Sequence, residues 1–234
     1  MSERPGLRHE LKFACDAAAH PVLCMALRLD RAGLRTSYPA RRVHSLYLDT
    51  TYQRALQENL AGMGERSKVR LRWYGAAEGE VAAVLERKRR ENTLGWKETW
   101  PVPGTLVVAG VERRALVREL ARRADGAWRE LLAVLEPTQW ISYRREYLVS
   151  ADGRVRVTLD RELRFSDQRL PARLSPLART PAPRLLVLEV KCAPEHLGEA
   201  REIVSRLAIP MGRCSKYVLA SEPSGGPLPS VLAV

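Results

Sequence analysis

Basic side chains occupy every second position of the segment 65–74, which reads ERSKVRLRWY. Side chains of a β-strand alternate between its two faces, so this segment predicts a strand with one basic face and one apolar face. The basic face carries Arg66, Lys68, Arg70 and Arg72, and the apolar face carries Val69, Leu71 and Trp73. Because neighbouring like charges repel one another, we expect an anion to meet the basic face. For a single strand, a solvated outer face of a sheet is the alternative.

Four further segments alternate charged and apolar positions: RHELKF at 8–13, LERK at 85–88, RVRVTLD at 154–160 and LEVK at 188–191. If helices cover the apolar faces, the charged faces converge inside one closed antiparallel sheet. Alternation then places further charged side chains on the inside, namely Lys12, Lys88, Arg154, Arg156, Glu189 and Lys191. The predicted channel is mostly positive, and its acids balance charge or hold a divalent cation; they are Glu10, Glu86, Asp160 and Glu189.

The elements that must position these side chains follow from periodicity and turn residues. Strands are predicted at 7–13, 43–48, 65–74, 80–89, 96–102, 140–149, 155–163, 185–191 and 215–219. Helices are predicted at 15–29, 112–124, 127–136 and 194–207, with a helical turn at 49–59 and a Pro- and Arg-rich loop at 168–184. The fold class is therefore α+β, with a single domain over 1–221 and a disordered tail over 222–234.

Lysine and arginine outnumber the acids by 39 to 27, which gives a formal net charge of +12. A surplus of this size implies an anionic partner, such as nucleic acid, an acidic membrane surface or a phosphorylated small molecule. A nucleic-acid binder predicts aromatic side chains interleaved with the bases on an exposed face. Here the strand aromatics fall on the apolar face, so nucleic acid is not an expected partner.

Cysteine and histidine show no metal-ligand spacing in the sequence, and we expect free thiols. These residues are Cys15, Cys24, Cys192, Cys214, His9, His20, His44 and His196. The N-terminus lacks an apolar signal core, and no apolar run reaches the roughly 18–20 residues that span a bilayer. These features predict a cytoplasmic protein, and a membrane-protein partner stays possible. The sequence carries no indication of oligomeric state.

An ordered set of short motifs resembles the vacuolar transporter chaperone (VTC) domain of the triphosphate tunnel metalloenzyme superfamily. The motifs are RHELKF, SLYLDT-x-Y, RSKVRLRWY, LERK, YRRE, RVRVTLD, LEVK and SKY, and they run from Arg8 to about Tyr217. The resemblance implies a closed eight-stranded antiparallel β-tunnel with helices packed on its outer face. It further implies binding of ATP and inorganic polyphosphate with a divalent metal, Mn²⁺ or Mg²⁺.

The resemblance also assigns roles to residues of this sequence. Arg70, Arg72, Lys216 and Glu189 become the catalytic set, with Glu189 as the metal ligand and Tyr143 as a nucleotide contact. As phosphate-binding residues the resemblance adds Lys88, Lys97, Arg145, Arg213 and Ser215. Strand alternation adds Lys12, Lys68, Arg156 and Lys191 to the expected phosphate-binding set. A sister group begins with E-x-E-x-K, whereas this chain has Arg8 in place of the first glutamate. This departure favours the polyphosphate branch.

The expected function is a polyphosphate polymerase that transfers the γ-phosphate of ATP to a growing polyphosphate chain. A tunnel open at both ends would let a long product leave opposite the nucleotide. Two alternatives stay open: an inorganic triphosphatase that uses water as the acceptor, and a non-catalytic polyphosphate-binding module. Phosphoryl transfer of either kind needs positioning and charge neutralisation, which fixed arginines and one metal supply.

Overall fold

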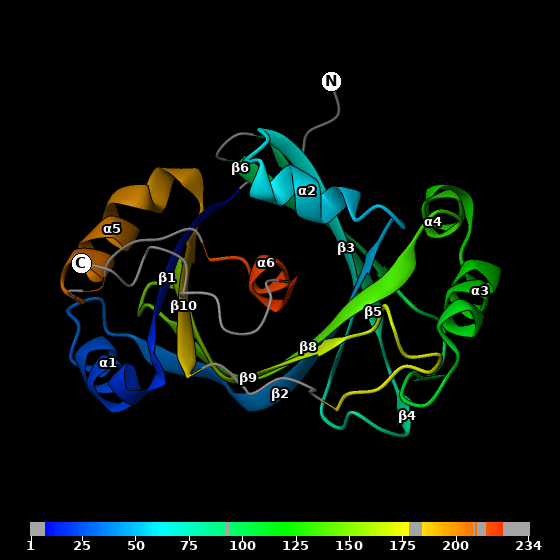
Figure 1. The fold of residues 1–234 in the computed structure, drawn as a ribbon. Coiled ribbons are helices and arrows are strands. Elements are labelled where there is room, and N and C mark those ends of the chain that lie inside the picture. Colours follow the sequence, from blue (N-terminus) through cyan, green and yellow to red (C-terminus); the bar gives the residue numbers. More distant parts are fainter. Residues whose placement is uncertain (1–7, 92–93, 178–183, 208, 210–213, 222–234) are drawn as a thin grey trace.

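The computed structural model describes residues 8–91, 94–177, 184–207, 209 and 214–221 (Figure 1). The expected disordered tail, 222–234, lies outside these residues. The strands are β1 (His9–Asp16), β2 (Arg35–Asp49), β3 (Glu65–Tyr74), β4 (Glu80–Val81), β5 (Val84–Glu91), β6 (Leu94–Pro101), β7 (Leu106–Val107), β8 (Glu136–Val149), β9 (Val155–Asp167) and β10 (Leu185–Cys192). The α-helices are α1 (His20–Arg28), α2 (Arg54–Leu60), α3 (Arg113–Arg123), α4 (Gly126–Leu132), α5 (Leu197–Ser205) and α6 (Lys216–Ser221), and the 3₁₀ turns are Ala17–Ala19 and Pro194–His196.

One eight-stranded sheet, in the order β1-β10-β9-β8-β2-β3-β5-β6, forms the frame of the molecule. All of its neighbouring strands pair antiparallel. The sheet curls until its two edges meet, at an antiparallel bridge between Arg8 and Gly95. The expected α+β tunnel is thereby confirmed, and within the described residues its seam is bridged at that residue pair.

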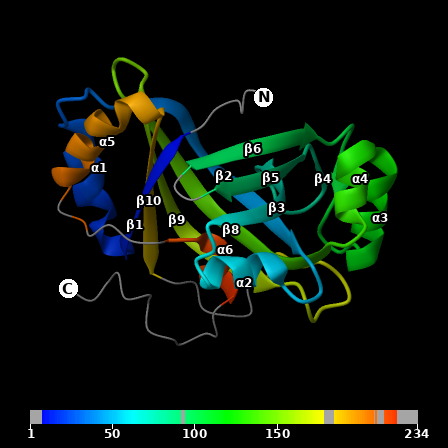
Figure 2. The ribbon, with the colours of Figure 1, turned by 90° about the horizontal axis from the view of Figure 1, so that it is seen from above.

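Two helix pairs cover the outer face of the sheet at opposite sides (Figure 2). On one side α3 and α4 contribute Leu116, Leu120 and Leu132 to a core with β3, β5 and β8. On the other side α1 and α5 pack on β1, β9 and β10. The residues predicted to lie under helices are indeed buried in these two cores: Val69, Leu71, Val157 and Leu188. The predicted facing of the strands is therefore confirmed.

The last described element departs from the prediction, because residues 215–219 begin a helix instead of a strand. Ser215 starts α6: its backbone carbonyl accepts the Leu219 N–H at 2.9 Å, and its Oγ accepts the Val218 N–H. Five residues with Tyr and Val suit either state, and periodicity cannot decide over so short a run. Packing decides instead, because Tyr217 is buried among side chains of several elements.

Helix α6 lies within the ring of strands in Figure 1, next to β8, β9 and α2. Inward-facing apolar side chains surround it and form what we call the α6 core. Its buried members are Ala14, Val43, Tyr47, Leu56, Ile141, Tyr143, Leu163, Leu185, Val187, Cys214 and Tyr217. The interior is therefore packed at one end, and the expectation of a tunnel open at both ends is wrong.

Other element boundaries differ from the predicted ones. Strand β2 begins at Arg35 and passes through Pro39, where a register shift between Tyr38 and Arg41 accommodates the missing N–H. Cys15 belongs to β1 instead of a helix. Among the described residues, no helix combines the length and the apolar character needed to cross a bilayer.

A buried hydrogen bond fixes α6 inside the sheet, and its loss should be measurable. Tyr217 donates to Asp49 Oδ2 at 2.7 Å, and Asp49 also accepts the N–H groups of Ala55 and Leu56 at the start of α2. We predict that Tyr217→Phe lowers the free energy of unfolding by about 1–3 kcal/mol, as expected for a hydrogen bond to a charged group. Urea denaturation measures this. Tyr52→Phe, at a 90% exposed position, is the control and should change nothing; equal effects of the two would contradict the anchoring role.

Candidate functional site

The charged half of the inward face lies beside the α6 core and is built by seven strands and α6. Strand alternation carries the side chains of its strand residues inward, and Lys216 enters from α6. Its ionic members are Glu10 and Lys12 on β1, Lys68, Arg70 and Arg72 on β3, Glu86 and Lys88 on β5, Lys97 on β6, Arg145 on β8, Asp160 on β9, Glu189 and Lys191 on β10, and Lys216 on α6. Cations outnumber carboxylates in this set, so the carboxylates are shared.

Glu86 collects three cations from two neighbouring strands. It accepts from Arg70 Nε at 2.7 Å and from Lys97 Nζ at 2.9 Å, and Arg72 Nη1 lies 3.6 Å away. Burial would raise the pKa of Glu86, but these cations outweigh burial and hold its pKa well below the ordinary value. Glu86 therefore stays ionised and sets the direction of both arginines.

Glu189 and Glu10 meet at one ammonium group. Lys12 Nζ lies 3.3 Å from each carboxylate, and Lys191 Nζ lies 2.9 Å from Glu189. Burial and the neighbouring Glu189 would raise the pKa of Glu10, but Lys12, Lys88 and Lys191 lower it to about 2. Both carboxylates are therefore ionised and face a common point.

Asp160 links β8 and β9 to α6. It takes both arms of Arg145, at 2.5 and 2.6 Å, and Lys216 Nζ at 2.6 Å. Lys216 and Arg145 also lie over the Tyr143 ring, 5.0 and 5.2 Å from its centroid. Tyr143 is only 1% exposed and belongs to the α6 core. The Tyr143 ring therefore packs against two cations, at the boundary between the apolar and charged halves.

Lys68 differs from its neighbours because no carboxylate contacts it within the described part of the chain. Its Nζ donates to Ser215 Oγ at 2.8 Å. Burial lowers the pKa of Lys68 well below its ordinary value, and the nearby Lys12 and Lys88 add to the shift. Burial and Lys12 likewise lower the pKa of Lys88 to about 8, although Glu10 partly compensates. The negative charge around Lys68 and Lys88 is therefore too small to keep their pKa values at the ordinary value for lysine.

Buried polar atoms in this region lack a hydrogen-bond partner. Among them are Arg72 Nε and Ser45 Oγ, and Ser45 pairs with Arg72 across β2 and β3. An unsatisfied buried polar group costs about 1–3 kcal/mol, so native proteins rarely keep one without a reason. An anion with several acceptor oxygens would satisfy Arg72 and Lys68 together.

The remaining expected site residues fall at the margins. Arg156 faces inward by alternation but is exposed, and the Lys97 side chain is 48% exposed. Arg154 is exposed and pairs with Glu199 of α5, so the interpretation of this side chain as part of the channel lining is wrong. Arg213 lies outside the described residues.

Sequence reasoning missed Ser45 and Tyr47, which face the charged and apolar halves from β2. The Tyr47 hydroxyl oxygen lies 3.4 Å from Arg70 Nη1, and the Tyr47 ring stacks on the ring of Tyr217. Alternation along 43–48 offered the signal, because both residues share the parity of Val43, another member of the α6 core. Glu10 and Glu86 were expected on the inward face, without specific roles.

The carboxylate pair fits a divalent cation in part. Mg²⁺ and Mn²⁺ prefer oxygen ligands, and Mg²⁺ is commonly held by one or two carboxylates together with substrate phosphates. Glu10 and Glu189 meet that description, and in the described residues no third Asp, Glu, His or Cys joins them closely. A metal here would therefore need the oxygen atoms of a bound anion.

The shifted pKa of Lys68 leads to a test with sulfate, an anion that does not itself titrate near neutral pH. An anion beside Lys68 raises its lowered pKa, so sulfate binding should be accompanied by proton uptake at this amine. Lys88, with a pKa of about 8, is mostly protonated at about pH 7, so proton uptake measured at that pH reports on Lys68. Calorimetry in buffers of different ionisation enthalpy measures the uptake.

Lys68→Met should abolish the proton uptake. Lys191→Met is the matched control, since it removes a cation of the same face that is not among the main causes of the Lys68 pKa shift; it should weaken sulfate binding and keep the uptake. Uptake that is the same in wild type and Lys68→Met would contradict the assignment.

Comparison with solved structures shows the fold at low sequence identity. The PH1819 protein from Pyrococcus horikoshii OT3 matches with a TM-score of 0.53 and 13% identity, over 91% of this chain and 97% of that chain. Proteins proposed to be adenylate cyclases match from Bacillus halodurans (TM-score 0.53, 15% identity, 91% and 97% coverage) and Vibrio parahaemolyticus (TM-score 0.52, 11% identity, 91% and 98% coverage).

A search of curated proteins finds no match. A family model does match, over residues 7–222, which is nearly the whole chain, and its description is the VTC domain. The ordered motifs, the curled eight-stranded sheet and this match agree. The chain belongs to the VTC domain family.

Proposed function

We propose that this protein is a metal-dependent ATP:polyphosphate phosphotransferase, which extends inorganic polyphosphate with the γ-phosphate of ATP. The observation that carries the proposal is the surplus of cations on the inward face. Lys68 has no carboxylate partner among the described residues, and Arg72 has an unsatisfied Nε. Membership of the VTC domain family supports a phosphate polymer as the ligand.

The arginines of β3 are the proposed grip on the reacting phosphoryl group. Glu86 fixes Arg70 and Arg72 in position, so their guanidinium groups are pre-organised and lose little entropy on binding. Lys216 and Arg145 stand opposite, held by Asp160. In the reaction, an oxygen of the acceptor phosphate attacks the γ-phosphorus, the bond to the β-phosphate oxygen breaks, and ADP leaves. These cations stabilise the charge that spreads over the transferring group.

Glu189 and Glu10 are the proposed metal ligands. A divalent cation held there would neutralise phosphate charge and orient the triphosphate. Lys12 and Lys191 would then exchange their contacts with Glu189 for contacts with phosphate. Lys88 and Lys97, further along β5 and β6, would bind the polyphosphate chain, with Arg156, Ser215 and Arg213 as additional contacts. Tyr143 would act on the nucleotide indirectly, by holding Arg145 and Lys216 over its ring.

Transfer to phosphate is preferred over hydrolysis because no buried histidine among the described residues lies on the charged half, and all of its carboxylates are engaged by bases. A water nucleophile therefore lacks an evident general base among these groups. One observation favours the alternative, an inorganic triphosphatase. The α6 core packs one end of the interior, so a long product has to leave on the side where the substrate enters.

The wider setting of the proposal follows from the sequence expectations. One domain over 1–221 carries the reaction, and the four free cysteines suit a reducing, cytoplasmic setting. ATP and inorganic polyphosphate are the partners, with a membrane protein as a possible further one. Nucleic acid is not proposed, because the cations face inward.

Product analysis separates the three functions. The protein is incubated with ATP and Mn²⁺ or Mg²⁺, and the products are resolved on a gel. Polyphosphate with ADP is the expected result. Free phosphate as the only product would replace the proposal with a triphosphatase, and the absence of ADP would replace it with a binding module.

Removing a proposed phosphate ligand should reduce turnover strongly. Arg72→Ala and Lys216→Ala are each predicted to lower the rate by ~10²-fold or more, because each supports charge on the transferring group. Initial rates of ADP release measure this below the melting temperature of every variant. Arg118→Ala, on the exposed face of α3, is the matched control and should retain wild-type rates.

The metal assignment has its own variant. Glu189→Gln should abolish metal-dependent ADP release, while tripolyphosphate binding persists because the cations stay in place. Calorimetry with tripolyphosphate and the rate assay together test this. Glu98→Gln, an exposed acid on β6, serves as the control. Full activity of Glu189→Gln would show that the metal assignment is wrong.

A further inference from the structure

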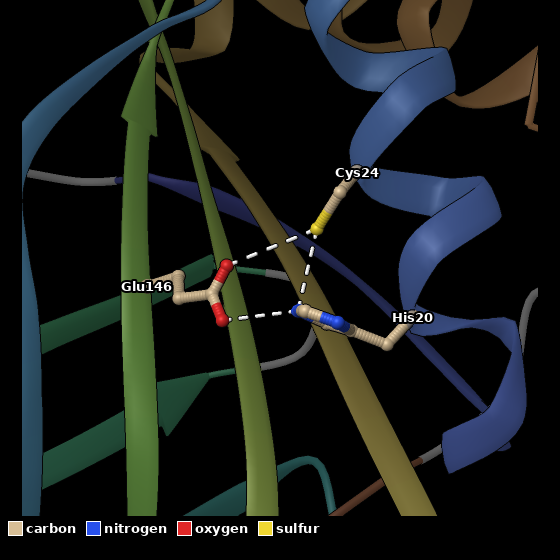
Figure 3. Close-up of side chains that lie close together, drawn as sticks. All are labelled: His20, Cys24 and Glu146. Carbon is tan, nitrogen blue, oxygen red and sulfur yellow. Dashed lines mark hydrogen bonds and ion pairs between the residues drawn. The ribbon is translucent and has the colours of Figure 1, made fainter.

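A second cluster of ionisable side chains lies outside the tunnel, between α1 and the outer face of the sheet. His20 and Cys24 come from α1 and Glu146 comes from β8 (Figure 3). His20 Nε2 lies 3.0 Å from Glu146 Oε1, and Cys24 Sγ lies 3.3 Å from His20 Nε2 and 3.8 Å from Glu146 Oε2. Glu146 points away from the tunnel because its neighbour Arg145 points inward.

The sequence expectation of no metal-ligand spacing is incomplete at this point. His20 and Cys24 are four residues apart, and residues at this spacing share one face of a helix. The third side chain lies 122 residues further along the chain than Cys24, so only the packing of α1 on β8 reveals the group. Among the described residues this is the one group of three such side chains with ligand atoms close together.

The distances suit a tetrahedral metal ion. Bonds of about 2.0–2.3 Å to nitrogen, oxygen and sulfur place the ligand atoms of tetrahedral zinc roughly 3.3–3.7 Å apart. Cys24 Sγ lies 3.3 Å from His20 Nε2 and 3.8 Å from Glu146 Oε2, close to that range, and one ligand atom from each of the three residues lies within 4.8 Å of the other two. Small side-chain movements would therefore admit the ion.

A catalytic relay does not fit the same atoms. In a Cys-His-carboxylate relay the thiol and the carboxylate contact opposite nitrogens of the imidazole. Here both approach Nε2 of His20. Three ligand atoms that converge on one point suit the binding of an ion better than the transfer of a proton.

One neighbour competes with a metal. Arg161 Nε donates to Glu146 Oε1 at 2.9 Å, the same oxygen that contacts His20. Glu146 Oε2 faces the Cys24 thiol and is available to a metal. Arg161 would then act as a second partner that orients the carboxylate, as outer-shell groups do in metal sites.

We propose that His20, Cys24 and Glu146 form a zinc site, with water as the fourth ligand. The ligands are the imidazole Nε2, a thiolate and a carboxylate oxygen. This ligand set binds zinc in preference to magnesium or calcium. Binding releases the thiol proton of Cys24 to solvent. The ion would join α1 to β8 directly, on the side of the sheet opposite to the phosphate-binding face, and so stabilise the packing of α1 without entering the reaction.

Cobalt(II) is the probe, because a thiolate ligand gives it a charge-transfer band in the near ultraviolet. Titration of the metal-free protein should produce this band with one Co²⁺ per chain, and Zn²⁺ should displace it. Cys24→Ser should remove the band. Cys15→Ser, which changes another partly buried free thiol on β1, should retain it and is the matched control.

Affinity and stability give independent measurements. Competition with a chromogenic chelator measures the Zn²⁺ affinity. His20→Ala and Glu146→Gln each remove a direct ligand, so each should weaken Zn²⁺ binding by at least about 100-fold, which is the largest effect typical of an outer-shell change. Zn²⁺ should raise the melting temperature of wild type and of Glu189→Gln, but not of Cys24→Ser. No thiolate band in wild type, or equal Zn²⁺ affinity of wild type and Cys24→Ser, would overturn the proposal.

Discussion

The structure depends on one constraint. Side chains alternate between the two faces of each strand, so a curled sheet must enclose every side chain on its inward face. Here that face holds lysines and arginines from six strands, and enclosing them costs solvation energy unless opposite charge is supplied. Four carboxylates supply part of it, each shared between two or more cations. The part that is not supplied is concentrated at Lys68 and Arg72. This imbalance makes the interior receptive to a polyanion.

The division of the interior into two halves follows from the same alternation. Towards one end the inward positions are apolar, as at Val187, Ile141 and Val43, and α6 fills the space between them. Towards the other end the inward positions are charged. Tyr143 and Asp160 stand at the boundary, and through them the packing of α6 fixes Lys216 and Arg145. The position of Lys216 and Arg145 is thereby coupled to a hydrophobic core.

Sequence reasoning predicted best where the pattern was long. The ten residues of β3 alternate without interruption, and both ends of the strand were predicted correctly. It failed where the pattern was short, as in α6, or broken. At Glu162, with φ of 53°, β9 shifts its register against β8, so Asp160 and Leu163 both face inward although their spacing is odd. Partners were also hidden, since the meeting of Lys12 with Glu189 depends on the register of β1 with β10. The same holds for Glu146 with α1.

The position of α6 at the end of the described chain has a consequence for biosynthesis. Strand β1 finds its partner β10 only after some 170 intervening residues have been made, and α6 comes later still. Such non-local pairing slows folding, because loop closure must precede the contacts that compensate for it. While the ribosome is still adding residues 214–221, Tyr47 and Tyr143 have no α6 to cover them, and a half-made chain exposes apolar surface of the kind that chaperones recognise. The interior is thus completed only after all eight strands of the sheet have been made.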